Sequence, residues 1–116
     1  MPTDETPPTG LLMTFSDPVK GEEAEYDDWY QNVHLPQVCA IPGIRSAQRF
    51  QLLDTGDGES GGPRNLAVYQ LDDDPQRVFA EMIARARSGA LDRSTSIDQS
   101  TVSVRLWRAN GAPVTG

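Results

Sequence analysis

The single histidine of this 116-residue chain, His34, lies in the stretch DDWYQNVHLPQV at residues 27–38. An imidazole has an unperturbed pKa of about 6.5, so it can take up or release a proton near neutral pH. Tyr30 precedes it by four residues and shares its face if the stretch is helical. Such a pair could move a proton beside a carbonyl group and hold the charge that develops on the carbonyl oxygen. We therefore interpret His34 and Tyr30 as candidate catalytic residues. The alternative is that the His34 ring bonds to the backbone and braces the turn.

Three further side chains are candidates for holding a ligand beside that pair. Trp29 and Tyr26 have helical spacing with Tyr30, although most aromatics so placed belong to a core. Arg49 lies in an alternating segment and could anchor a carboxylate or a phenolate if it faces a cavity. At an exposed sheet edge the same arginine would be an ordinary surface residue. We predict Trp29, Arg49 and Tyr26 as substrate-binding residues.

The sequence predicts neither a metal site nor a bound cofactor. One histidine and one cysteine, Cys39, cannot form the cluster of ligands that structural zinc requires. Cys39 itself follows an apolar turn and is interpreted as a small hydrophobic residue. The glycine-rich segment DTGDGESGG follows a predicted strand but leads to another strand. A phosphate-binding loop would instead lead to a helix.

The composition is typical of one globular domain with no affinity for polyanions. Hydrophobic residues make up 37% of the chain and charged residues 23%. The formal net charge is −7, whereas nucleic acids and anionic membranes need clustered lysine and arginine, so neither is expected as a partner. No run approaches the roughly 18 apolar residues of a membrane span. The lone cysteine and the absence of a signal-peptide pattern predict a cytoplasmic protein.

Hydrophobic periodicity predicts a first helix that starts near Glu22. Its apolar residues recur at i, i+3, i+4 and i+7, and they are Tyr26, Trp29, Tyr30 and Val33. This helix is expected to weaken at Leu35, because Pro36 disfavours α geometry at the residue before it. Pro36 is then expected to open a separate short turn.

A second helix and four strands complete the prediction. Asp74 caps this helix, Pro75 opens it and Gly89 ends it. Its predicted buried residues are Val78, Phe79, Met82, Ile83 and Ala86. The predicted strands are residues 10–15, 43–53, 65–71 and 101–108. We expect a disordered lead over residues 1–9, one domain over 10–108, a mobile loop over 54–64 and a flexible tail over 109–116.

This order, βαββαβ, predicts an α+β, ferredoxin-like fold with a four-stranded antiparallel sheet and two helices on one face. The other face still carries large apolar side chains, among them Phe50 or Leu53, and Trp107. A second copy of the same sheet is the economical way to cover them, so the sequence predicts a homodimer.

One motif extends from the first helix into the second strand. Its residues are Trp29-Tyr30, Val33-His34-Leu35-Pro36, Ile41-Pro42-Gly43, Ser46-Ala47 and Arg49-Phe50. The motif and the element order resemble the EthD-like branch of the dimeric α+β barrel superfamily. The resemblance implies that two chains pack sheet to sheet into a barrel, each with a cavity between its sheet and its helices. Haem-binding relatives use positions other than that of His34, so no haem is expected.

The resemblance leaves the reaction open, because the superfamily includes monooxygenases, polyketide cyclases, lactone isomerases and proteins with no assigned activity. The first hypothesis is a small cofactor-independent enzyme that acts on a hydrophobic cyclic or aromatic intermediate of catabolic or polyketide type. Its acid/base chemistry would be isomerisation, cyclisation, decarboxylation or oxygenation. The second hypothesis is a non-catalytic accessory or ligand-binding protein of an oxidative catabolic pathway.

Overall fold

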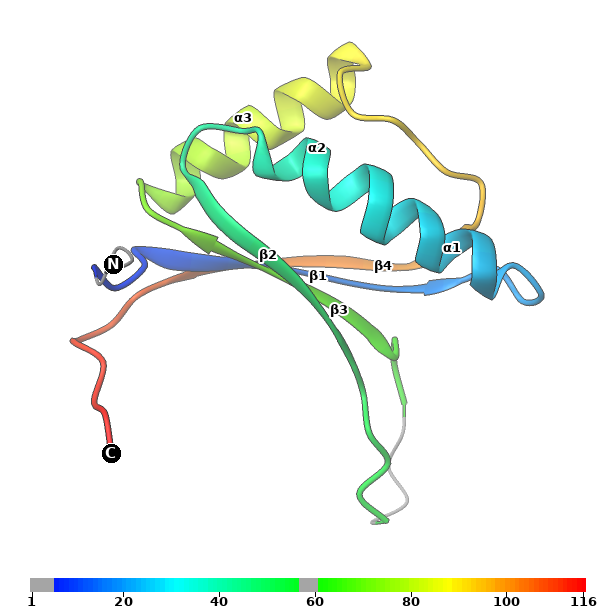
Figure 1. Cartoon of the computed structure of the whole chain (residues 1–116), viewed down its shortest axis with the longest axis horizontal. Coiled ribbons are helices and arrows are strands. Elements are labelled where there is room, and N and C mark those ends of the chain that lie inside the picture. Colours follow the sequence, from blue (N-terminus) through cyan, green and yellow to red (C-terminus); the bar gives the residue numbers. More distant parts are fainter. Residues whose placement is uncertain (1–5, 57–60) are drawn as a thin grey trace.

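The chain forms one four-stranded sheet whose helices all lie on the same side (Figure 1). The computed structural model describes residues 6–56 and 61–116. The elements in chain order are β1 (Gly10–Pro18), α1 (Glu23–Trp29), η1 (Tyr30–His34), α2 (Leu35–Cys39), β2 (Ile44–Gln51), β3 (Asn65–Leu71), α3 (Pro75–Ser88) and β4 (Ile97–Arg108). The strands are ordered β2-β3-β1-β4 in space, and each neighbouring pair is antiparallel. The predicted α+β, ferredoxin-like fold is therefore confirmed.

The hydrophobic core lies between the sheet and the helices. In the central strand β1, Leu12 pairs with Tyr69 of β3 and with Leu106 of β4, so these three side chains share the helix-facing side of the sheet. Leu12 and Tyr69 are fully buried there. The helical residues buried against them are Tyr26, Tyr30, Leu35, Val38, Pro75 and Val78.

The first helix continues past His34, where the sequence predicted that it would weaken. Segments α1, η1 and α2 follow one another without a break, and the N–H of Leu35 donates to the carbonyl of Tyr30, five residues back. A proline ring inside a regular α-helix collides with the carbonyl four residues before it. The wider π turn of η1 ends two residues before Pro36, where a turn of this kind would give the proline ring more room.

The π turn also explains why the predicted apolar stripe fails after Tyr30. The buried positions of this helix are Tyr26, Tyr30, Leu35 and Val38. The step from Tyr30 to Leu35 is five residues, one more than a regular helix would use. Val33, predicted to be buried, is consequently only half-buried.

Helix α3 begins and ends where the sequence predicted. The side chain of Asp74 accepts a hydrogen bond from the N–H of Gln76 at 3.3 Å, and Gly89 ends the helix with a φ of +84°. Val78 is fully buried. The other residues of the predicted stripe, Phe79, Met82, Ile83 and Ala86, are partly buried.

Two strands are longer than predicted where β1 meets β4. Strand β1 runs on to Pro18. A proline has no N–H to donate, but the pairing of β1 with β3 stops at Ser16, so no strand lies on that side of Pro18 to accept a hydrogen bond. Strand β4 begins at Ile97, which pairs with Pro18. Between them the register shifts, so that four residues of β4 lie opposite Ser16. Residues opposite a bulge do not follow the alternation of a regular strand, so the sequence prediction began this strand only at residue 101.

Strand β2 is shorter than predicted and ends at Gln51. A register shift at its start lies between Ile44 and Ser46. The sequence placed these two residues on one face, but Ile44 is buried while Ser46 is exposed. After the shift, Ala47 and Arg49 take the helix-facing side, since they pair with Tyr69 and Ala67.

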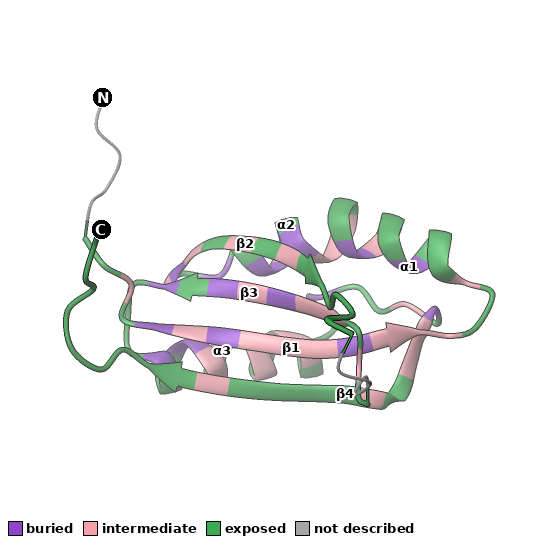
Figure 2. Cartoon of the chain, turned by 90° about the horizontal axis from the view of Figure 1, so that it is seen from below, coloured by how far each residue is buried: buried purple, intermediate pink, exposed green. Residues whose placement is uncertain are grey.

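The opposite face of the sheet, which we call the open face, carries seven apolar side chains and has no helix over it (Figure 2). By register these are Leu11, Met13, Phe15, Phe50, Leu66, Val68 and Trp107. Phe50 and Trp107, on the two edge strands, are 46% and 48% exposed. On globular proteins in general, large exposed apolar patches of this kind often mark interaction sites.

The chain enters and leaves the sheet at the same edge of the molecule (Figure 1), where the N–H of Ala109 donates to the carbonyl of Thr9 at 2.9 Å. Residues 109–116 are exposed and form no helix or strand. Residues 1–5 of the predicted disordered lead and residues 57–60 of the predicted mobile loop lie outside the described residues. No helix in the described part of the chain combines the length and the apolar character needed to cross a bilayer.

Candidate functional site

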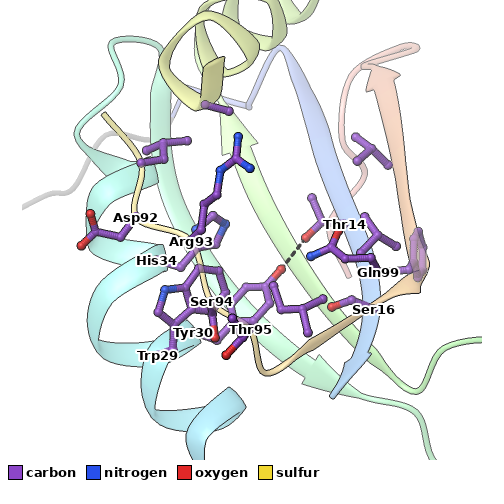
Figure 3. A pocket seen from close by; sticks show the side chains of 16 residues that line it. Thr14, Ser16, Trp29, Tyr30, His34, Asp92, Arg93, Ser94, Thr95 and Gln99 are labelled. Carbon is purple, nitrogen blue, oxygen red and sulfur yellow. Dashed lines mark hydrogen bonds between the residues drawn. The ribbon is translucent and has the colours of Figure 1, made fainter. Parts of the chain in front are cut away.

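A cleft of about 980 Å³ opens between the first helix and the β1–β4 half of the sheet (Figure 3). Residues 91–97, which connect α3 to β4, form its third wall. Its polar lining residues are Thr14, Ser16, Tyr30, His34, Asp92, Arg93, Ser94, Thr95 and Gln99. Its apolar lining residues are Phe15, Trp29, Ala86, Leu91, Ile97, Val102 and Val104. The volume falls within the range of roughly 300–1,000 Å³ that is usual for ligand pockets in proteins.

The imidazole of His34 packs against two aromatic rings at one wall of the cleft. It stacks on Trp29 with ring centroids 4.6 Å apart and an interplanar angle of 21°, and it meets Tyr30 edge-on at 5.1 Å. In a regular α-helix, Trp29 and His34 would point about 140° apart, because five residues exceed one turn. The π turn makes five residues close to one full turn, so it brings the two rings together.

Burial keeps the His34 imidazole neutral at pH 7. Removal from water lowers its pKa from 6.5 to about 4. Its Nδ1 atom is buried and has no hydrogen-bond partner among the described residues. The bond to the backbone that would make His34 a brace of the turn is thus not found in the part of the chain that the structure describes.

The indole nitrogen of Trp29 is also buried and has no partner among residues 6–56 and 61–116. The hydroxyl of Tyr69 is buried beside Tyr30 and Thr14, outside the lining of the cleft. Burial raises the pKa of the Tyr69 hydroxyl far above its usual range, and the neighbouring Tyr30 adds to the shift. An unpartnered buried donor costs roughly 1–3 kcal/mol, so a ligand that offers an acceptor would gain from binding it.

The two helical tyrosines are fixed by hydroxyl groups of β1. The Tyr30 hydroxyl lies 2.8 Å from Thr14 Oγ1, and the Tyr26 hydroxyl lies 2.6 Å from Ser16 Oγ. Burial raises the pKa of Tyr26 to about 12, while its bond to Ser16 opposes the shift. Thr14 can donate to Tyr30, which leaves the tyrosine proton for a ligand in the cleft.

Tyr26 and Arg49, predicted from the sequence to bind substrate, do not line the cleft. The guanidinium of Arg49 lies over the rings of Tyr26 and Tyr30, at 5.7 and 5.3 Å from their centroids. Its Nη2 is 2.6 Å from a carboxylate oxygen of Asp27. Arg49 therefore supports the tyrosines from behind, whereas His34, Tyr30 and Trp29 reach the cleft itself.

Sequence reasoning missed the contribution of residues 91–97, because it placed no element and no candidate site residue between Gly89 and the predicted strand at 101–108. Two backbone bonds hold this segment across the cleft: the N–H of Asp92 donates to Gln37 Oε1 at 2.8 Å, and the N–H of Val19 donates to the carbonyl of Ser96 at 2.7 Å. Leu91 is buried beneath it. The signal for Thr14 and Ser16 was present in the sequence, since they are polar residues at alternate positions of an otherwise apolar strand.

Chemically, the cleft can bind an apolar ring and offer it one neutral imidazole and one phenol. Within the described residues there is no group of three or more His, Cys, Asp or Glu side chains that could hold a metal ion. The side chains of His34 and Tyr30 in the lining are of kinds that transfer protons and form hydrogen bonds.

Comparison with known proteins supports the fold but assigns no activity. No protein-family model matches the chain, and no curated protein matches it. Among solved structures, the chain is similar to an ethyl tert-butyl ether degradation (EthD) family protein from Bacillus halodurans C-125, at 18% identity and a TM-score of 0.57. The match covers 90% of this chain and 97% of the other. At that identity the similarity establishes architecture alone: this chain has an EthD-like, ferredoxin-like α+β fold, as its sequence motif predicted.

Proposed function

We propose that the cleft binds a small hydrophobic molecule with a cyclic or aromatic ring, and that His34 transfers a proton to or from it without a cofactor. The observation that carries the proposal is the neutral imidazole at the cleft wall, with a buried Nδ1 that no described residue satisfies. Buried polar atoms without a partner are few in native proteins, and a catalytic role is one of the recognised reasons for such an atom.

The reaction would begin at a carbon next to a carbonyl group of the bound molecule. His34 takes the proton from that carbon, the C–H bond breaks, and its electron pair moves toward the carbonyl oxygen to give an enolate. The Tyr30 hydroxyl donates to this oxygen, because Thr14 fixes its position at 2.8 Å. Return of the proton to another carbon completes an isomerisation. Cyclisation can start from the same enolate, whose carbon would attack a second carbonyl group, whereas decarboxylation of a 3-keto acid would give such an enolate as CO₂ leaves, and His34 would then protonate it. Oxygenation would need dioxygen as a co-reactant that takes electrons from the enolate.

A pKa of about 4 makes His34 a weak base in the empty cleft. The enolate is negatively charged, and a negative charge close to the ring stabilises the imidazolium, so the pKa rises as the reaction proceeds. Trp29, stacked at 4.6 Å, also favours the imidazolium through its π face.

A second function, ligand binding without turnover, is favoured by one observation. No carboxylate contacts His34 among the described residues, whereas catalytic histidines are commonly oriented by one. The aromatic wall alone would then serve an accessory protein that carries a reactive intermediate.

Deuterium exchange separates the two functions. The protein is incubated in D₂O with 1-tetralone, a bicyclic aromatic ketone, and loss of the α-proton signal is followed by proton NMR. We expect exchange above the buffer rate, and a roughly 10²–10⁴-fold loss in His34→Gln. Cys39→Ala is the control, since Cys39 is exposed and outside the cleft. Binding with no exchange above buffer would refute the catalytic proposal and leave the carrier function.

We also propose that the working form is a homodimer joined through the open face. The seven apolar side chains of that face support it, because they would otherwise stay in contact with water. The predicted cytoplasmic location belongs to the same proposal and rests on the lone cysteine.

A further inference from the structure

Arg93 is the only cationic side chain among the residues that line the cleft. In the part of the chain that the structure describes, its guanidinium has no hydrogen bond and no ion pair. Other arginines are committed elsewhere, in the pairs Arg45–Asp72, Arg49–Asp27, Arg77–Asp73, Arg85–Glu81 and Arg108–Asp74. A guanidinium presents a planar fork of donors that matches the oxygens of a carboxylate or a phosphate, and the single positive charge of Arg93 balances the single negative charge of a carboxylate.

The backbone holds Arg93 in place before any ligand arrives. It lies between the two anchored points of residues 91–97, one residue after the Asp92–Gln37 bond and three before the Ser96–Val19 bond. Leu91 is buried directly before it. An anchored backbone leaves only side-chain rotamers to be ordered on binding, so less conformational entropy is lost.

The electrostatics of the cleft favour an anion at this point. The whole chain carries a net charge of −7, which disfavours the binding of anions in general. Asp92 is the only acidic residue of the lining, and Figure 3 shows its carboxylate pointing away from the Arg93 guanidinium. His34 is uncharged at neutral pH. A bound anion would therefore meet one positive charge and no negative one pointing at it.

We propose that the molecule bound in the cleft is a ring-containing carboxylic acid, whose carboxylate pairs with Arg93 while its ring packs against Trp29 and His34. This inference rests on the proposed function and narrows it from hydrophobic molecules in general to apolar acids. It makes Arg93 a specificity-determining residue with no part in the proton transfer itself.

The test compares 2-naphthoate with the uncharged 2-naphthamide, which has the same ring and nearly the same shape. Isothermal titration calorimetry at low ionic strength measures both dissociation constants for the wild type. We expect naphthoate to bind about tenfold more tightly, the usual scale for a charge-assisted hydrogen bond. In Arg93→Gln that preference disappears while naphthamide affinity stays unchanged. Arg87→Gln, which removes an equal charge at an exposed site outside the cleft, keeps the preference.

The other possible results distinguish a failure of the carboxylate inference from a failure of the proposed cleft function. If the wild type binds the two probes equally, the carboxylate inference fails while binding of rings in the cleft stands. If Arg93→Gln loses both probes equally, Arg93 shapes the wall and does not select the anion. If neither probe binds the wild type at millimolar concentration, the inference and the proposed cleft function fail together. Naphthoate preference without tetralone exchange would support Arg93 and refute only catalysis.

Discussion

At the scale of single residues, the imidazole of His34 links stability to pH. Its pKa is about 4 in the folded chain and about 6.5 when unfolded, so the unfolded state binds more protons between these values. Stability contributed by the neutral ring is complete above pH 6.5 and falls as the pH drops toward 4. By pH 4.5 the loss should reach about 2–3 kcal/mol.

Urea unfolding at pH 7 and pH 4.5 measures this loss. Carboxylates titrate in the same range, so the comparison is with His34→Gln, which lacks the imidazole but keeps every carboxylate. The wild type should lose about 2–3 kcal/mol more than the variant between the two pH values. Equal losses would mean that the ring is solvated and its pKa ordinary.

Arg49 offers a second residue-scale test, because it contacts both helical tyrosines from outside the cleft. Arg49→Met removes its ion pair with Asp27 and its position over the two rings, while much of the aliphatic side chain remains. We expect a loss of about 1 kcal/mol in unfolding free energy and little change in naphthamide affinity. A loss of affinity with unchanged stability would restore Arg49 to the predicted role of a substrate-binding residue.

At the scale of elements, most boundaries followed from the sequence, and the misses have identifiable physical causes. Helix α3 was predictable because Asp74, Pro75 and Gly89 mark its two ends by local chemistry. Strand β3 was likewise bounded by polar residues. The longer β1 and β4 depend on pairing across a bulge, a non-local property that no run of neighbouring residues encodes.

The candidate site was half predictable for the same reason. Tyr30 stands next to Trp29 and four residues before His34, so regular helical spacing placed Tyr30 beside His34 but did not bring Trp29 and His34 together. Arg93 and Thr14 come from distant segments that meet only through the sheet pairing of β1 with β4. The stacking of Trp29 on His34 depends on the π turn. From Pro36 the sequence predicted only that the helix would weaken, not that a π turn would form.

That link between the π turn and Pro36 can be tested by deletion. Removing the exposed Gln31 shortens the step from Tyr30 to Leu35 to four residues, which restores α-helical spacing to the buried side chains. It also returns Pro36 to a regular helix interior, so we expect a loss of about 3 kcal/mol. In a Pro36→Ala background the same deletion should cost far less. Equal costs in urea unfolding of the two backgrounds would show that the turn does not serve the proline.

At the scale of the whole molecule, the open face sets the expected assembly. Two chains of 12.7 kDa give a dimer of about 25 kDa in light scattering. Trp107→Glu puts a charge into the proposed interface and should shift the mass toward 12.7 kDa, since burying an unpaired charge is costly. Val114→Glu, at a residue that is 96% exposed, should leave the dimer intact. A wild type that is monomeric at micromolar concentration would contradict the barrel.

The contact between Thr9 and Ala109 has a consequence for the connectivity of the fold. Because the N–H of Ala109 reaches the carbonyl of Thr9 at 2.9 Å, a few glycine and serine residues would suffice to join them. New ends could then be opened between Gly61 and Gly62, which are exposed and lie outside every strand. The permuted chain would run β3-α3-β4-β1-α1-η1-α2-β2. Strands β4 and β1 would become a hairpin, and every pairing of the sheet would survive. The arrangement of the sheet in space thus does not depend on the order in which the chain visits its strands.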